Sequence, residues 1–423
     1  MYDFDKGIEA AFPFGRKNLI EFNIAIHQLL LFFVTMKRTL SNLILSLFVF
    51  AFFTLFSCES DENKSGRLED IPVFKSEMDI EYARNFRVEY FEDYKKVTVL
   101  ESFRGASKPE EYYLVDKEID LPTLPADAKI IRTPISEIVV SSTSHLPMLE
   151  LIGEAESLVG FPTLDLISSR VFRDRIDAGA IRDVGRESGF NKESLIDLQP
   201  ELVVGFTLGT NLDAYSDINR VGIPVVFNAE YLEETPLGRA EWIKFMAVFY
   251  NKEAQADAVF TEIKNRYNDL LEKAKAIENK PTALSGMMYG DTWYAPGGQS
   301  WASKFFVDAG VDYFWQNTET TGSLELSFES VLDIAEKAEF WVGVANVSTL
   351  TELKNSNARY ALFAPFQQGN VWTYNKRMGA KGGNDYLEMG YARPDLILSD
   401  LVKIFHPQLL PDYETYFFQQ LSE

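Results

Sequence analysis

The chain has 423 residues, of which 46% are hydrophobic and 14% aromatic. A chain of this length and composition can form two globular units with packed cores and still leave a leader segment. The formal net charge is -22 at pH 7, which argues against binding to nucleic acid or to an anionic membrane surface, because phosphate binding needs clustered Lys and Arg. The single Cys excludes an internal disulfide and a cysteine-based zinc site.

The N-terminal region contains the pattern of a secretory signal peptide. Lys37 and Arg38 precede the apolar run 43–56, which is too short for a comfortable membrane span, and Ser57 stands directly before Cys58. The segment resembles a bacterial lipoprotein signal, and the resemblance implies that Cys58 is lipidated. A buried or reactive Cys in a membrane helix is the alternative interpretation.

These features divide the start of the chain into two parts. We expect residues 1–57 to be an upstream extension and a signal peptide, with Met36 as the true start. Residues 58–81 begin with a polar, charged stretch and are expected to form a flexible tether.

Residues 82–135 show apolar residues at every second position, as in Phe86, Val88 and Tyr90. This period is typical of short strands joined by polar turns. We interpret the region as an N-terminal β extension that caps the first lobe, with a contact platform as the alternative.

In residues 136–250 buried strands alternate with helices. The expected strands are 138–140, 201–204 and 225–227, and a helix is expected at 192–198. Such alternation predicts a parallel sheet, whose ligands bind beyond the carboxyl ends of the strands. The candidate ligand-binding residues in the loops at these ends are Ser142, Thr143, His145, Phe161, Phe206 and Tyr231.

Residues 251–280 are predicted to form one long helix. Their apolar residues, from Ala256 to Ala274, recur at steps of three, four and one, and neither Pro nor Gly interrupts them. A stiff helix at this place would join two lobes and hold a cleft between them.

The segment 281–423 is expected to be a second α/β lobe, because it repeats a pattern of the first. The stretch 193–198 precedes the strand 202–205 in the same way that 329–334 precedes 340–343. Its strand ends are rich in aromatic and polar residues, which suits a large flat ligand. The candidates are Tyr289, Trp293, Asn346 and Tyr374, and the Gly-rich stretch 379–384 is expected to form an adaptable rim.

An anionic ligand would need cations in the cleft, where Arg can bind oxygen atoms bidentately. The candidates near cleft loops are Arg173, Arg186, Lys376, Arg377 and Lys381, and a solvated surface position is the alternative for each of them. His145 either contacts a bound metal complex or makes a hydrogen bond at a helix start. No site for a bare metal ion and no cofactor is expected, because outside the leader only His145 and His406 are available.

A series of short motifs, in this order and spacing, carries a family resemblance. They are Ile138–Ser142 with Leu149–Gly153, Val159–Gly160, Asp183–Gly185, Asn191–Leu198 with Pro200–Val204, and Gly222–Val226. The chain from Ser136 onward resembles the class III periplasmic substrate-binding proteins of ABC importers, which bind iron siderophores, haem or cobalamin. The resemblance implies two Rossmann-like α/β lobes with central parallel sheets, joined by one long rigid helix. It also implies that Glu193 and Glu329 dock onto arginines of the importer, whereas the residues alone would equally suit acids at helix starts.

The sequence contains no HExxH, no GxSxG and no phosphate loop with Lys, so we do not expect an enzyme. We expect a monomeric, lipid-anchored periplasmic protein that delivers a metal chelate to an ABC importer permease dimer. The chelate is a siderophore complex, haem or cobalamin, and the sequence leaves these three open. A lipoprotein that captures or senses such a ligand without docking is the alternative, and an extracytoplasmic hydrolase with paired carboxylates is a further one.

Overall fold

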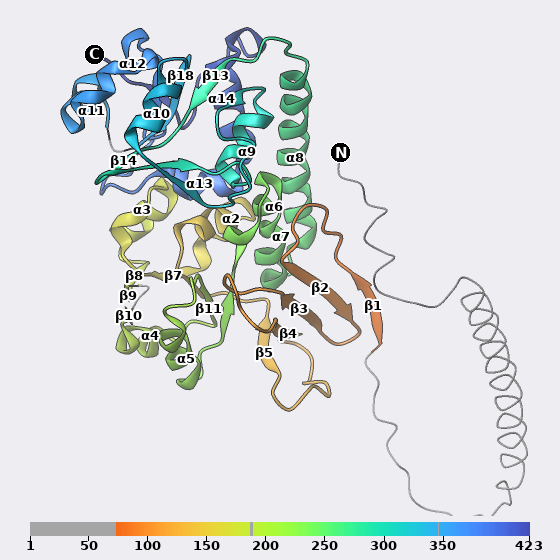
Figure 1. Ribbon diagram of the computed structural model, residues 1–423. Helices are drawn as coiled ribbons and strands as arrows, with labels where there is room; N and C mark the ends of the chain where they lie inside the picture. The colour runs from red at the N-terminus through yellow and green to blue at the C-terminus, as the bar shows by residue number, and fades with distance from the viewer. Residues whose placement is uncertain (1–72, 187–188, 346) are drawn as a thin grey trace, which may run out of the picture. The chain divides into compact units, whose positions relative to one another are not determined.

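The N-terminal β extension is a five-stranded sheet in the order β1-β2-β3-β4-β5 (Figure 1). The computed structural model describes residues 73–423 except 187, 188 and 346, so the leader and Cys58 lie outside the described residues. The strands are Phe74–Glu77 (β1), Phe86–Phe91 (β2), Lys95–Val99 (β3), Glu110–Asp116 (β4) and Lys129–Thr133 (β5). The prediction of a tether up to residue 81 is wrong at its end, because β1 pairs with β2.

This sheet packs on the first lobe, as expected. The Phe86 ring lies 4.8 Å from the Trp242 ring. The carboxylate of Glu241 accepts hydrogen bonds from the backbone N–H groups of residues 81–83 at 2.7–2.9 Å, and Glu233 accepts those of residues 84 and 85. Two buried carboxylates therefore bind one turn of the extension, which satisfies backbone donors that would otherwise be costly to bury.

The first lobe contains a fully parallel sheet in the order β12-β11-β6-β7-β8. Apart from the exposed edge strand β8, its strands are short and apolar, which is typical of strands covered on both faces. They are Ile138–Val140 (β6), Leu158–Phe161 (β7), Arg182–Asp183 (β8), Leu202–Gly205 (β11) and Val225–Phe227 (β12). The helices are Leu146–Leu151 (α2), Arg170–Asp177 (α3), Lys192–Leu198 (α4) and Leu212–Arg220 (α5), with a short 3-10 turn Thr143–His145 (η1) and a hairpin of Gly185–Arg186 (β9) and Gly189–Phe190 (β10).

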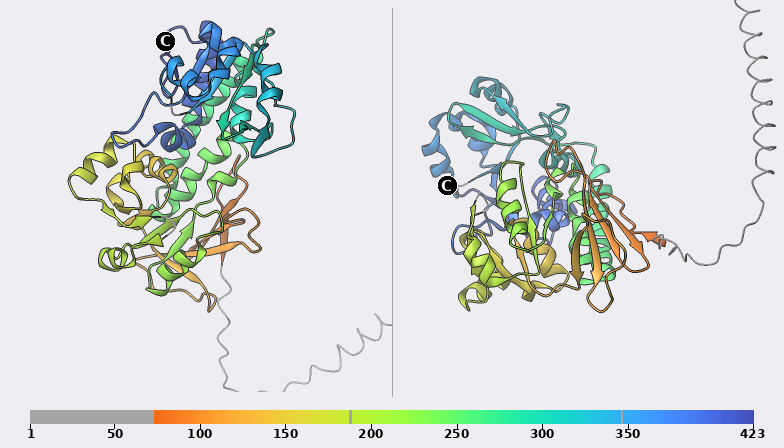
Figure 2. Two further views of the ribbon diagram at one scale, coloured as in Figure 1. Left: turned by 60° about the vertical axis from the view of Figure 1, so that its left-hand side comes forward. Right: turned by 90° about the horizontal axis from the view of Figure 1, so that it is seen from below.

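The connection to the second lobe runs through three helices, Pro236–Ala240 (α6), Trp242–Ala247 (α7) and Glu253–Lys275 (α8). Helix α8 is the predicted linking helix, slightly shorter at both ends than expected. Its predicted apolar stripe is buried, and it packs on α7 of the first lobe and on Pro394–Phe405 (α14) of the second. In Figure 1 it runs alongside both lobes, and Figure 2 shows the same arrangement from two further directions.

The second lobe has a sheet in the order β16-β13-β18-β19-β20, in which only β20 is antiparallel. The strands are Thr282–Leu284 (β13), Asp312–Tyr313 (β16), Phe340–Val344 (β18), Val371–Thr373 (β19) and Gln419–Gln420 (β20). A separate antiparallel sheet contains Met287–Tyr289 (β14), Thr292–Pro296 (β15) and Ser323–Leu326 (β17). The remaining helices are Trp301–Asp308 (α9), Phe328–Ala335 (α10), Leu350–Ser356 (α11), Ala364–Gln368 (α12) and Asp385–Ala392 (α13).

The predicted repeat between the lobes is confirmed at the level of elements. Helix α4 precedes β11, and α10 precedes β18. Each helix has a polar cap, because the Asn191 side chain accepts from the Ser194 amide and the Ser327 side chain accepts from the Ser330 amide. Among the described residues, no helix has both the length and the apolar content needed to cross a membrane.

The buried carboxylate of Glu241 generates a stability prediction. Replacement of Glu241 by Gln leaves part of the turn 81–83 without its acceptor and removes the negative charge 3.2 Å from Lys244, which keeps its contacts with Asp257 and the Asp79 carbonyl. We expect the free energy of unfolding to fall by about 2–4 kcal/mol, measured by urea denaturation. The control is Glu262→Gln on the exposed side of α8, where Glu262 makes only a 3.7 Å surface ion pair and a change within about 0.5 kcal/mol is expected. Equal effects of the two substitutions would contradict the prediction.

Candidate functional site

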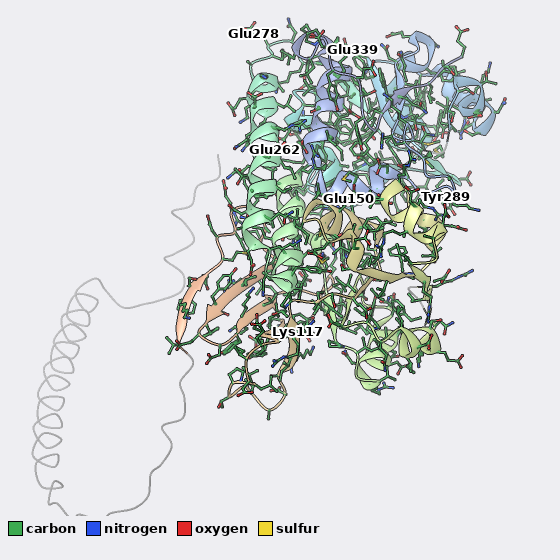
Figure 3. All side chains as sticks on the ribbon, turned by 180° about the vertical axis from the view of Figure 1, so that it is seen from behind. Lys117, Glu150, Glu262, Glu278, Tyr289 and Glu339 are labelled. Carbon is green, nitrogen blue, oxygen red and sulfur yellow. The ribbon has the colours of Figure 1, made fainter. Side chains whose placement is uncertain are left out.

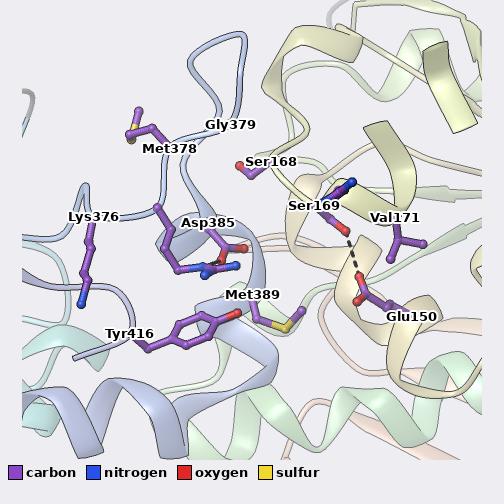
Figure 4. Close-up of a pocket in the computed structure, with 12 residues that line it drawn as sticks. Glu150, Ser168, Ser169, Val171, Lys376, Met378, Gly379, Asp385, Met389 and Tyr416 are labelled. Carbon is purple, nitrogen blue, oxygen red and sulfur yellow. Dashed lines mark hydrogen bonds and ion pairs between the residues drawn. The ribbon is translucent and has the colours of Figure 1, made fainter. Parts of the chain in front are cut away.

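A pocket of about 440 Å³ lies between the two lobes and is lined by residues of both. This volume is in the range of sites that hold a small organic ligand. Figure 4 shows the first-lobe residues on one side of the pocket and the second-lobe residues on the other. The lining residues are Glu150, Ser168, Ser169, Arg170, Val171, Lys376, Arg377, Met378, Gly379, Asp385, Met389 and Tyr416.

The first-lobe wall is formed by the start of α3 and the end of α2. Ser169 is the residue before α3, and its hydroxyl donates to Glu150 Oε2 at 2.9 Å. Arg170 follows with its side chain 92% exposed, and its only described ion-pair partner is Asp174 at 3.6 Å. Its guanidinium is therefore able to turn toward a ligand without breaking a buried contact.

The second-lobe wall is formed by the segment that follows β19 and by the first turn of α13. Arg377 donates from Nε to Asp385 at 2.7 Å, and its guanidinium lies 4.2 Å from the centre of the Tyr416 ring. Burial acts to lower the pKa of Arg377, but the hydrogen bond to Asp385 and the charge interactions with Asp385 and Tyr416 together outweigh it, so the pKa is raised and the charge is secure. Lys376 donates from Nζ to the Thr415 carbonyl.

The charge of this pocket differs from that of the whole chain. Three cationic side chains and two carboxylates line it, whereas the chain has a net charge of -22. A local excess of positive charge at a mouth lined by Arg and Lys favours an anionic, oxygen-rich ligand.

Next to the pocket, a buried carboxylate of the second lobe binds the first lobe directly. Glu388 on α13 accepts hydrogen bonds from the backbone N–H groups of Ser168 at 2.6 Å and Ser169 at 3.0 Å. Burial raises the pKa of Glu388 to about 7; the two amides act to lower it, and Asp385 adds to the increase. The contact that joins the lobes at the pocket therefore depends on whether the Glu388 carboxyl group is protonated.

The Gly-rich stretch after Arg377 completes this junction. A Cβ atom at Gly379 would lie 2.9 Å from Ser168 Cα, and one at Gly383 would lie 2.2 Å from the Leu166 carbonyl oxygen. The expectation of an adaptable rim at 379–384 is therefore wrong, because these glycines allow close packing against the first lobe.

His145 lies beneath this junction. Its side chain is 0% exposed, in a turn that packs on α13, and Nε2 lies 3.5 Å from Glu230 Oε2. Neither ring nitrogen has a hydrogen-bond partner among the described residues. The ring therefore makes no hydrogen bond at the helix start, whereas the His145 amide donates to the Ser142 carbonyl at 3.2 Å. Burial acts to raise the pKa of Glu230, but His145, the Ser144 hydroxyl and Arg239 together outweigh it and the pKa is lowered.

Only some of the predicted site residues line a pocket. Arg377 and Lys376 line the interlobe pocket, and Tyr374 lines a neighbouring cavity of the second lobe. Asn346 lies outside the described residues. None of the other candidates lines the interlobe pocket; these are Ser142, Thr143, His145, Phe161, Arg173, Arg186, Phe206, Tyr231, Tyr289, Trp293 and Lys381.

For three of these residues the prediction is corrected because the side chain is held inside its own lobe. Trp293 is 0% exposed and donates to the Ser285 carbonyl at 3.2 Å, because it points from the second position of β15 into the aromatic core. Phe161 is also in the core. Arg173 is held inside the first lobe by the Leu164 carbonyl at 2.8 Å.

Further candidates are placed away from the pocket. Tyr289 is 82% exposed at the outer edge of the second lobe (Figure 3), and Arg186 is exposed in the β9–β10 hairpin. Ser142 and Thr143 are half-buried, and the Ser142 hydroxyl bonds to that of Ser144 at 2.8 Å. Phe206 and Tyr231 pack edge to face, with ring centres 5.0 Å apart.

Sequence reasoning missed most of the first-lobe wall and the junction residue Glu388. The site was expected at the ends of strands, whereas Ser168 and Ser169 precede helix α3 and Glu388 lies within α13. The Ser168–Ser169 pair is a helix-start signal that could have drawn attention to this wall. The described residues include no group of three or more His, Cys, Asp or Glu that could hold a metal ion.

Comparison with known proteins identifies the family. A family model described as periplasmic binding protein matches residues 138–378. The chain belongs to the periplasmic binding protein family. The N-terminal sheet precedes the matched region.

Two uncharacterized lipoproteins of Methanocaldococcus jannaschii are similar to this periplasmic binding protein. One is 25% identical over 415 residues, covering 90% of this chain and 96% of the relative. The other is 25% identical over 317 residues, covering 71% and 76%.

Solved structures show the same two-lobed fold. A periplasmic haem-binding protein from Pseudomonas aeruginosa has a TM-score of 0.52 at 15% identity, covering 68% of this chain and 99% of that one. CeuE from Helicobacter pylori with Ni(II) bound has a TM-score of 0.50 at 18% identity, covering 70% and 92%.

The raised pKa of Glu388 predicts a dependence of stability on pH. In the folded protein the carboxyl binds a proton up to about pH 7, whereas in the unfolded chain it releases the proton near its ordinary value of about 4.3. The contribution of proton binding by Glu388 to the free energy of unfolding is therefore complete below about pH 4.3 and is lost as the pH rises through about 7. We expect wild type to lose about 3 kcal/mol across this range relative to Glu388→Gln, measured by urea unfolding at a series of pH values.

The control for this prediction is Glu150→Gln, which changes another carboxylate of the same pocket. This variant should keep the pH dependence of wild type. A pH profile for Glu388→Gln that is parallel to that of wild type would contradict the prediction.

Proposed function

We propose that the protein is the substrate-binding component of an ABC importer and that it binds a metal chelate between its two lobes. The observation that carries this proposal is the interlobe pocket of about 440 Å³, to which both lobes contribute and in which cations exceed carboxylates. Ferric siderophores and haem carry anionic oxygen atoms that Arg170, Lys376 and Arg377 could bind.

The comparisons support the class of ligand proposed. The chain belongs to a family of binding proteins, and the structures that share its fold include a haem-binding protein and a protein with Ni(II) bound. We propose binding without chemical conversion, with a metal chelate as cargo and no resident cofactor.

The proposal places the protein outside the cytoplasmic membrane, in the periplasm, anchored by a lipid on Cys58. The naming of two relatives as lipoproteins supports this, as does the pattern of basic, apolar and small residues before Cys58. The tether would then start at the lipid and end at β1.

The proposed docking residues are Glu193 and Glu329, which are placed alike on the two lobes. Each lies in the first turn of its helix, after a separate cap residue, and both are exposed. Their carboxylates are thus available to a partner with two equivalent basic pockets. Glu329 differs in having a local cation, since Arg359 Nη1 lies 3.8 Å from its Oε1.

The pocket cations generate a binding prediction. We expect Arg170→Ala and Lys376→Ala each to weaken binding of an anionic chelate about three- to tenfold, because each removes one charge that faces the ligand. The measurement is isothermal titration calorimetry with haemin, cyanocobalamin and ferric catecholate and hydroxamate chelates. Arg220→Ala, an equal change of charge on the exposed face of α5, should leave affinity unchanged. Failure of all of these ligands to bind wild type would overturn the proposed ligand class.

The docking residues generate a separate prediction about transport. The double substitution Glu193→Ala and Glu329→Ala should reduce chelate uptake by cells at least tenfold while calorimetry shows unchanged affinity, because the removed carboxylates lie away from the pocket. The matched control is Asp197→Ala with Asp333→Ala, one turn further along the same two helices. Unchanged uptake in the glutamate variant would instead support a protein that captures or senses the chelate.

A further inference from the structure

Helix α13 of the second lobe connects the interlobe pocket to the first lobe. It packs on η1, α2 and α6, and its residues Asp385 and Met389 line the pocket opposite Ser168 and Ser169 (Figure 4). Glu388, on the same helix, is 1% exposed and accepts from the backbone N–H groups of both serines. Any movement that separates α13 from the start of α3 must therefore break this contact.

The Glu388 contact contains no cation. Its hydrogen-bond donors are two neutral amides, and Asp385, one turn earlier on α13, adds to the effect of burial and raises the pKa of the carboxyl group to about 7. A carboxyl group buried without a cation keeps its proton to a higher pH than an exposed one. When the contact opens, water reaches the group, and it releases its proton near the ordinary value of about 4.3. Opening is therefore linked to the loss of one proton.

A second contact between α13 and the first lobe does not change its charge near neutral pH. The Arg239 guanidinium of α6 lies 5.1 Å from the centre of the Tyr391 ring on α13 and 4.8 Å from that of the Trp301 ring on α9. It also donates to the carbonyl groups of Tyr231 and Glu233. Burial lowers the pKa of Arg239, but a guanidinium group stays protonated in proteins. Of these two contacts, only that of Glu388 responds to pH.

The other charged and titratable groups around α13 have partners of their own or lie at the pocket. Glu150 of α2 accepts from the Ser169 hydroxyl at 2.9 Å, and Arg377 donates to Asp385 at 2.7 Å. The remaining groups are His145 of η1 with Glu230, Arg170 of α3, Lys376, Tyr416, and Arg393, Asp395 and Asp400 at α14. Within the described part of the chain, none of these groups bonds to Glu388.

We propose that Glu388 makes access to the interlobe pocket depend on pH, because its protonated form keeps the lobes closed and its ionised form favours their opening. A protonated carboxyl group can stay buried against the start of α3. An ionised one would be a buried charge without a cation, which is costly, and water stabilises it once α13 moves away. Acidification thus closes the pocket. This inference concerns regulation of the proposed binding site, and its bearing on a chelate rests on the proposed function.

The difference between the closed and open states sets the size of the effect. The carboxyl group releases its proton at about pH 7 in the closed state and near pH 4.3 in the open state. The ratio of closed to open molecules therefore falls as the pH rises between these two values and is constant below and above them. Between pH 5 and pH 7 we expect it to fall about fortyfold.

Amide hydrogen exchange in the ligand-free protein measures this ratio, because the Ser168 and Ser169 amides exchange only when their contact with Glu388 is broken. Their protection factors, which are corrected for the intrinsic effect of pH on exchange, should fall about fortyfold from pH 5 to pH 7 in wild type. Glu388→Gln is neutral at every pH, so its protection factors should stay constant over this range. Glu262→Gln, which removes an exposed carboxylate of α8, should retain the wild-type profile.

Two further measurements exclude other causes of exchange. The Val203 amide, which donates to the Pro224 carbonyl inside the parallel sheet, exchanges through global unfolding and should be better protected than the serine amides at every pH. Asp385→Asn removes the negative charge that raises the pKa of Glu388, and it should move the profile of the serine amides to lower pH. This variant replaces Glu388→Gln in the test if Glu388→Gln does not fold.

Calorimetry connects the contact to the binding site. For any chelate of the panel that binds at pH 7, a change from pH 5 to pH 7 should strengthen binding by wild type about five- to fortyfold more than binding by Glu388→Gln. The comparison of the two proteins cancels the protonation of the chelate itself. An equal effect of pH on binding by both proteins would contradict a role of Glu388 in access to the pocket.

The exchange results decide the inference independently of the proposed function. Serine protection that does not change with pH in wild type, or that equals the protection of Val203, would overturn it. So would an unchanged pH profile in Glu388→Gln, because another group, such as His145, would then be the cause. If no chelate binds while the exchange results are as expected, the proton-dependent contact is supported and only the proposed cargo is contradicted.

Discussion

The structure depends on one continuous helix that belongs to the cores of both lobes. The buried face of α8 starts against the first lobe and the N-terminal sheet, where Phe260 meets Tyr82 with ring centres 6.0 Å apart. It ends against the second lobe, where the Tyr267 hydroxyl donates to Asp308 at 2.6 Å. Because the helix has no Pro or Gly, it limits the separation of the lobes along one side.

On that other side the lobes meet through α13, which packs on η1, α2 and α6. The carboxylate of Glu388 and the close packing of Gly379 and Gly383 connect it to the start of α3. This contact covers His145 and leaves the interlobe pocket beside it. The lobes must therefore part slightly for a large ligand to reach the buried groups, while the long helix limits how far they move.

Local sequence patterns predicted most of the helices and strands. The interlobe pocket, in contrast, is formed by contacts between residues that are far apart in the sequence. The stripe of α8 and the two helix–strand repeats were predictable because each is set by residues a few positions apart. Strand β1 was missed because its sequence FKSE is exposed throughout and shows no alternation. The contact of Glu388 with Ser168 joins residues 220 positions apart, and nothing local marks either of them as its partner. Trp293 was misplaced because it lies within strand β15 and not beyond its end, and the alternation of the strand turns its side chain into the core.

The most direct test of the account locks the lobes together. A Cβ atom at Gly379 would lie 3.4 Å from Ser168 Cβ, close to the roughly 3.5–4.5 Å separation found in disulfides. Because the same atom would lie 2.9 Å from Ser168 Cα, the two segments must move slightly to accept it, so the reduced double variant must first bind the chelates as Cys58→Ser alone does. In a Cys58→Ser background, Ser168→Cys with Gly379→Cys should form a disulfide, and calorimetry with the chelate panel would compare the oxidised and reduced protein. The account predicts that oxidation blocks chelate binding and that reduction restores it. Equal affinity in both states would contradict the claim that the ligand binds between the lobes.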